Sequence, residues 1–118
     1  MGHLSTHVLD LMHGCPAAGM SVKLQAIDGE HIKTIKTVTL NADGRTDNGP
    51  LLAAEAMAAG RYRLVFSVAQ YFAAKGIQLP SPAFIDEVPI DFGIADAAGH
   101  YHVPLLVSPW AYSTYRGS

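Results

Sequence analysis

Alternation between apolar and polar residues dominates this chain and restricts it to folds built from half-buried β-strands. The pattern runs through residues 22–26, 61–68, 87–92 and 100–107, and more briefly through 5–9. Successive side chains of a strand point to opposite faces, so each segment offers one apolar face to a core. Turn-forming residues separate the segments at 28–29, 41–44, 47–50 and 97–99. Short strands at this spacing predict an all-β fold, an antiparallel sandwich or barrel.

Two segments and two prolines interrupt the alternation. The alanine-rich residues 51–59 predict a helical turn or two, and residues 69–75 predict a short helix that ends at Gly76. Pro89 and Pro104 lie inside predicted strands. Because proline cannot donate a ladder hydrogen bond, we expect both at a sheet edge, a strand start or a bulge.

Length and composition favour one compact domain over residues 1–118 with its own core. The chain is 49% hydrophobic and 15% charged, which excludes disorder, and its formal charge is −2. Lysine and arginine are scattered, so we expect neither a nucleic-acid partner nor a membrane surface. Cys15 is the only cysteine, which excludes an intrachain disulfide. The start at Met1 lacks a secretory leader, and we expect a cytoplasmic protein.

Histidines mark the two ends of the chain as candidate site segments. His100 and His102 share a strand face with Pro104 and Leu106, and this face points away from the core. Such a mixture suits a groove or a subunit interface. The alternative is two ordinary surface histidines beside a proline. His7 shares a strand face with Ser5 and Leu9, while Thr6 and Val8 point the other way. A lone strand histidine is more often structural.

The same histidines raise the possibility of a catalytic zinc, which often takes three protein ligands. The His-x-His pattern is weak evidence for a metal, so we favour metal-free catalysis. Arg45 follows a turn, where it is either a solvated cation or a planar donor fork for an anionic or carbonyl-rich ligand. Arg116 carries the same ambiguity. The sequence contains no nucleophile elbow, P-loop or dinucleotide fingerprint.

Several stretches of the chain resemble the transthyretin-like family, and specifically its 5-hydroxyisourate hydrolase branch. The similar stretches are residues 4–10, 44–47, 84–90 and 100–118, with 61–76 similar to the strand-then-helix segment of transthyretin. The ending Tyr115-Arg116-Gly117-Ser118 distinguishes the hydrolases of this family from its hormone carriers. The resemblance covers essentially the whole chain.

The resemblance implies a fold, an assembly and a site. The fold is an antiparallel β-sandwich of two four-stranded sheets with one short helix. The assembly is a homotetramer, a dimer of dimers, with active sites in its central channel. The implied catalytic residues are His7, Arg45 and His102. The residues implied to bind substrate are His7, Arg45, Tyr115, Arg116, Gly117 and Ser118, with no metal and no cofactor.

The implied reaction is hydrolysis of 5-hydroxyisourate to 2-oxo-4-hydroxy-4-carboxy-5-ureidoimidazoline during urate degradation. Water attacks a ring carbonyl, which calls for a base, a donor for the oxyanion and a proton for the leaving nitrogen. Histidine suits the first and last tasks, because its ordinary pKa of about 6.5 lies near working pH. Which of His7 and His102 is base stays open, as does the role of His100. A channel carrier of small aromatic ligands and a zinc hydrolase remain alternatives.

Overall fold

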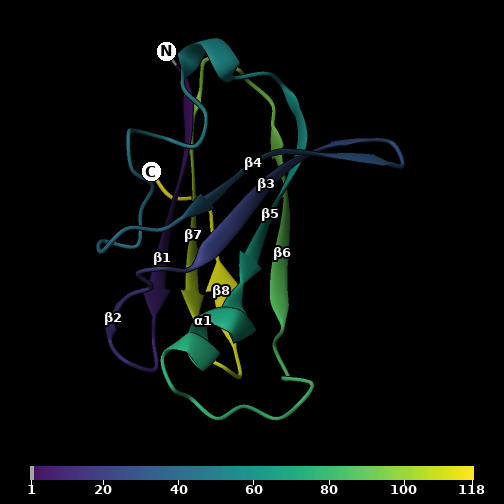
Figure 1. Ribbon diagram of the computed structural model, residues 1–118. Coiled ribbons are helices and arrows are strands. Elements are labelled where there is room, and N and C mark those ends of the chain that lie inside the picture. The colour runs from purple at the N-terminus through teal and green to yellow at the C-terminus, as the bar shows by residue number, and fades with distance from the viewer. Residues whose placement is uncertain (1) are drawn as a thin grey trace.

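Two four-stranded sheets packed face to face make up the computed structural model, which describes residues 2–118 (Figure 1). The first sheet has the order β2-β1-β7-β8 and the second has the order β4-β3-β5-β6. The first sheet comprises β1 (His3–Asp10), β2 (Cys15–Pro16), β7 (His100–Val107) and β8 (Tyr112–Thr114). The second comprises β3 (Ser21–Asp28), β4 (His31–Thr39), β5 (Gly60–Ser67) and β6 (Glu87–Ile94).

The sandwich expected from the sequence is confirmed, with one pairing that the expectation did not contain. Every neighbouring pair of strands is antiparallel except β1 and β7, which run parallel over their full length. Figure 1 shows these two strands side by side, although they come from opposite ends of the chain. The parallel pair is possible because the whole second sheet lies between them in the sequence.

The core lies between the sheets and follows the alternation seen in the sequence. Leu4, Val8 and Leu105 are fully buried on the inner face of the first sheet, and they meet Leu64 and Phe66 of the second. The alternate residues of β1, which are His3, Ser5, His7 and Leu9, face outward and are half-buried. This arrangement confirms that His102 lies on the side of the sheet that faces away from the core, and His7 lies on the same side.

Both predicted helical segments are present. Residues 54–56 form a single 3₁₀ turn, η1 (Ala54–Ala56), and α1 spans Val68–Ala74. The chain leaves α1 through Gly76, whose φ of +86° is readily adopted by a residue without a Cβ. Phe72 and Val68 anchor the helix in the core, where they are fully buried.

The two prolines differ in outcome. Pro89 lies in the edge strand β6, as expected, but the expectation for Pro104 was wrong, because β7 is an inner strand of its sheet. The β8 pairing ends at Thr114 opposite Leu105, and pairing returns only at a bridge between His102 and Gly117. The His102 and Pro104 carbonyls both accept hydrogen bonds from the tail. The N–H and C=O of one strand residue point to the same side, so the N–H that Pro104 lacks would also have faced the tail. The proline therefore interrupts this ladder inside the sheet.

Strand β4 was not predicted, and its residues explain why. Its apolar residues, Ile32, Ile35 and Val38, are spaced three apart and give no period-two signal. The structure accommodates this spacing with a bulge, since the pairing shifts register between Leu24 and Gln25 so that Ile35 has no opposite residue. Nearly all of β4 is exposed, so burial did not impose alternation on its sequence.

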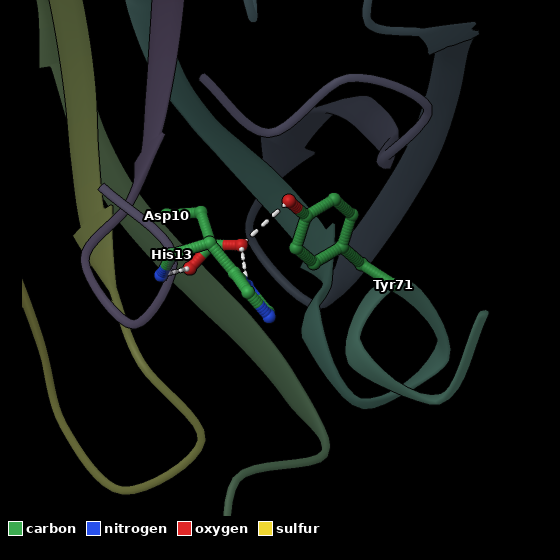
Figure 2. A network of polar contacts seen from close by, with 3 residues as sticks. All are labelled: Asp10, His13 and Tyr71. Carbon is green, nitrogen blue, oxygen red and sulfur yellow. Dashed lines mark hydrogen bonds and ion pairs between the residues drawn. The ribbon is translucent and has the colours of Figure 1, made fainter. Parts of the chain in front are cut away.

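A buried carboxylate ties the end of β1 to the helix. One oxygen of Asp10 accepts hydrogen bonds from the Tyr71 hydroxyl at 2.7 Å and from the His13 ring at 2.6 Å (Figure 2). The His13 backbone N–H donates to the other oxygen at 2.9 Å. Burial would raise the pKa of the Asp10 carboxyl, but these donors outweigh it and the pKa is lowered. The carboxylate is therefore the form that the fold stabilises.

We expect Asp10→Asn to lower the free energy of unfolding by about 1.5–3 kcal/mol, because the donors around it then face a neutral amide. Tyr71→Phe is the matched control and should cost about 1 kcal/mol, since it removes a single hydrogen bond. A lowered carboxyl pKa contributes stability above the unfolded pKa of about 3.9 and loses it as pH falls through the folded value. Urea unfolding between pH 7 and pH 3 should show a smaller acid loss for Asp10→Asn than for the parent chain; equal slopes would contradict this account.

Candidate active site

The parallel register of β1 and β7 brings the outward-facing histidines of both chain ends onto one surface. His3 pairs with His100, Ser5 with His102 and His7 with Pro104. The His3 and His100 rings lie 4.2 Å apart between centroids. Neither His3 nor Ser5 was predicted to belong to the site. Ser5 shares a face with His7 in the sequence, but its proximity to His102 depends on a pairing that no local pattern reveals.

His102 is held on three sides by short contacts. Ser5 Oγ lies 2.8 Å from His102 Nδ1. The Gly117 N–H donates to the His102 carbonyl at 2.8 Å. Gly117 also packs against the imidazole so closely that a Cβ on it would lie 2.5 Å from Cδ2 of the ring. The predicted site residue Gly117 is thus required to be glycine by the histidine beside it.

Arg45 reaches this surface because its loop is fastened to β1. Within the loop, Asn41 Oδ1 accepts the backbone N–H of Asp43 at 2.9 Å and that of Arg45 at 3.1 Å. Gly44, at φ +71°, accepts the backbone N–H of Val8 at 3.0 Å. A Cβ at Gly44 would lie 2.5 Å from the Val8 carbonyl oxygen, so only glycine permits this approach. Arg45 follows directly and carries an exposed side chain next to the histidine face.

The environment of both central histidines favours their neutral form. Burial lowers the pKa of His7, and the Arg45 charge lowers it further, against a smaller opposing effect of a hydrogen bond to the Asp43 backbone and of the Asp43 charge. Burial likewise lowers the pKa of His102, followed by the charges of Arg45, His7 and His3. The sensitivity of both rings to Arg45 places the three predicted catalytic residues within one electrostatic neighbourhood.

The tail residues are positioned along β7 and β8 to different degrees. The Arg116 guanidinium stacks on the Tyr101 ring at 4.3 Å from its centroid and donates to the His100 carbonyl at 3.1 Å. The neighbouring Tyr115 is 61% exposed, and Ser118 is exposed as well. Tyr115 and Arg116 occupy the gap in the ladder opposite Pro104, so their backbones are not tied into the sheet there.

Four of the predicted site residues border two hollows, whereas His7, Gly117 and Ser118 line neither of them. A cavity of about 300 Å³ is lined by His3, Ser5 and Arg45. A second, of about 390 Å³, is lined by His102, Tyr115 and Arg116 together with residues of β6, among them Ile90 and Phe92. Ser5 lines the first cavity and His102 lines the second, and these two side chains are in contact with each other.

No ready metal site accompanies these side chains. Within residues 2–118, no three His, Cys, Asp or Glu side chains are placed so that they could hold one ion. None of the helices in this part of the chain has the length and apolar character that crossing a membrane requires.

Comparisons with known proteins agree with the geometry. The model of the HIUase/Transthyretin family matches residues 4–117. The 5-hydroxyisourate hydrolase of Pseudomonas aeruginosa is 52% identical over 118 residues, which are 100% of this chain and 93% of that protein. Among solved structures, Klebsiella pneumoniae 5-hydroxyisourate hydrolase has a TM-score of 0.77 at 36% identity, with 100% of both chains covered. An (S)-allantoin synthase has a TM-score of 0.92 at 43% identity, where 99% of this chain covers only 44% of that longer one.

We expect Arg45→Gln to raise the pKa of both His7 and His102 toward the ordinary value of about 6.5, because the cation that disfavours each imidazolium is gone. Arg45→Lys is the matched control, and it should keep both pKa values lowered because it keeps the charge. Histidine ring titration by NMR measures both effects. A histidine pKa that stays unmoved in Arg45→Gln would show that Arg45 does not act on that ring.

Proposed function

The chain belongs to the HIUase/transthyretin family, and we propose that it acts in the hydrolase branch of this family. It hydrolyses 5-hydroxyisourate to 2-oxo-4-hydroxy-4-carboxy-5-ureidoimidazoline, a step of urate degradation. The observation that carries the proposal is the surface formed by β1 and β7, where one arginine lies beside two half-buried histidines whose pKa values are lowered. A neutral imidazole beside a fixed cation supplies both a base and an oxyanion donor.

Our proposal for the reaction divides its proton transfers between His7 and His102. One imidazole removes a proton from water as the water oxygen attacks a carbonyl carbon of the ring. The bond from that carbon to the ring nitrogen then breaks, and the nitrogen takes a proton while a carboxyl group forms. The second imidazole orients the water or supplies this proton. Lowered pKa values support the role of base, because a protonated ring cannot accept a proton from water.

Arg45 provides the positive charge in this mechanism. Its guanidinium holds the oxygens of the substrate and stabilises the negative charge that develops on the attacked carbonyl. The Gly44 contact with β1 supports this role, because it fixes the loop before the reaction begins. A preset donor pays no reorganisation cost in the transition state.

The tail completes the pocket in this proposal. Tyr115 positions the substrate, Ser118 helps to close the pocket, and Arg116 and Gly117 line it. The loosened ladder opposite Pro104 supports the assignment, because it leaves Tyr115 and Arg116 able to face a ligand.

We also propose that the chain forms a homotetramer, a dimer of dimers, with the sites in its central channel. The half-buried outer face of β1 and the exposed apolar side chains beyond it support an interface there. Leu11, Met12 and Trp110 are between 51% and 59% exposed. The cytoplasmic location and the single-domain organisation stay predictions.

A second candidate function is that of a carrier for small aromatic ligands. The cavity beside β6 favours it, because Ile90, Phe92 and Val103 give that cavity an apolar wall. A carrier does not require two histidines with lowered pKa values beside an arginine, so catalysis accounts better for His7, Arg45 and His102.

Turnover of freshly made substrate tests the function. Urate oxidase generates 5-hydroxyisourate from urate, and its ultraviolet absorbance then decays spontaneously. We expect this protein to accelerate the decay, and a chelator to leave the acceleration unchanged. Loss of activity with chelator, restored by zinc, would favour the zinc hydrolase. No acceleration at all would favour the carrier.

We expect Arg45→Ala to lower turnover by at least a hundredfold, a loss of about 3 kcal/mol of transition-state stabilisation, while the assembly stays intact. Arg45→Lys should recover only a small part of the rate, because a single ammonium does not reproduce the planar donor fork. Rates come from the ultraviolet assay and the assembly from size-exclusion chromatography. Near-parent turnover in Arg45→Ala would exclude the assigned role.

A further inference from the structure

The contact between Ser5 and His102 indicates which ring nitrogen of His102 bears the proton, a point that the proposed reaction leaves open. The two ring nitrogens of a neutral imidazole have opposite hydrogen-bonding character, since one bears the proton and the other a lone pair. Whatever hydrogen bond one nitrogen makes therefore decides what the other can do for a ligand. Ser5 Oγ lies 2.8 Å from His102 Nδ1, which is a hydrogen-bonding distance. This hydrogen bond therefore determines the character of Nε2.

The remaining surroundings of His102 leave only Nε2 for a ligand. Gly117 packs on the Cδ2 and Cγ edge of the ring, and Ser5 occupies Nδ1 on the other edge. The main chain of His102 is engaged as well, because its carbonyl accepts the Gly117 N–H. The ring is therefore held in one orientation with a single polar atom unoccupied by these contacts.

His7 is fixed in a different way. Its ring hydrogen-bonds to the backbone of Asp43, an interaction that raises its pKa and so involves the carbonyl oxygen as acceptor. A carbonyl accepts only, so the His7 nitrogen facing it bears the proton and the other nitrogen bears the lone pair. That free nitrogen of His7 has the character of a base.

We propose that Ser5 is a positioning residue that donates its hydroxyl proton to His102 Nδ1 and so keeps the ring proton on Nε2, facing the substrate. This inference rests on the proposed hydrolase function. His102 Nε2–H is then a hydrogen-bond donor to the carbonyl oxygen that becomes the oxyanion, and His7, oriented by the Asp43 carbonyl, is the base that takes the proton from water. The protonated His7 then gives this proton to the leaving ring nitrogen as the carbon–nitrogen bond breaks, which leaves both rings neutral.

The donor direction suits the hydroxyl as well as the histidine. Ser5 is half-buried, and His102 is the polar partner that the structure gives its side chain within residues 2–118. A hydroxyl that donates to Nδ1 satisfies its own proton and the lone pair of the ring in one hydrogen bond. With the opposite direction, the Ser5 proton would need a further acceptor.

The test combines the tautomer with kinetics. We expect ¹⁵N NMR of the whole protein near pH 8 to show His102 protonated on Nε2, with Nδ1 as the acceptor. Ser5→Ala should lower kcat about tenfold and leave KM within about twofold, because the ring loses its orientation and not its access to substrate. Ser5→Thr keeps the hydroxyl and should restore most of kcat. Ser67→Ala, which removes a half-buried hydroxyl from the second sheet, is the control and should match the parent chain.

Distinct results separate this inference from the function on which it rests. A His102 protonated on Nδ1 in the parent chain overturns the inference even if the enzyme is active, and so does a parent-like kcat in Ser5→Ala. A merely structural role for Ser5 would lower stability in urea and leave the tautomer unmoved, which also overturns it. Failure of the parent chain to accelerate substrate decay removes the proposed function, whereas the NMR result for the tautomer stands independently.

Discussion

The parallel pairing of β1 with β7 is the constraint on which both the fold and the site depend. It joins residues 97 positions apart, and the buried Thr6 hydroxyl donates to the Val103 carbonyl across it at 2.7 Å. Closing so long a loop costs conformational entropy, which burial of the inner faces of both strands offsets. The same register sets Ser5 against His102 on the outer face. Packing on one side of the sheet therefore assembles the chemistry on the other.

Two further contacts turn that surface into a site, and both involve a glycine that allows close approach. Gly44 brings the loop of Arg45 against β1, and Gly117 brings the tail against the ring of His102. The gap opposite Pro104 lies between the two tail pairings. Pro104 removes one ladder hydrogen bond and so loosens the tail near the histidines. The pairings on either side of this gap keep the tail attached to β7.

Much of the fold was predictable from local pattern, because burial of one strand face leaves a period-two record in the sequence. Strands β1, β3, β5, β6 and β7, the short helix and the outward direction of His102 followed from that record. Strand β4 did not, since an exposed edge strand with a bulge at Ile35 is under no such selection. Pro104 was misplaced because the rule against central prolines concerns missing hydrogen bonds, and here the neighbouring segment makes none at that point.

The residue types of the site and the strand faces they occupy could be predicted from the sequence. The resemblance to a known family indicated which of these residues form one site. The alternation predicts which side chains of each strand face away from the core, and turn residues predict where the chain can reverse. Neither pattern predicts which strands become neighbours or in which direction they run, because packing between distant segments determines the pairing. The contact of Ser5 with His102 follows from that pairing. The lowered pKa values beside Arg45 and the division of the site between two hollows also depend on the packing of the Arg45 loop and the tail. Only the tertiary structure decides them, since hydrogen bonding, burial and charge act through space and not along the chain.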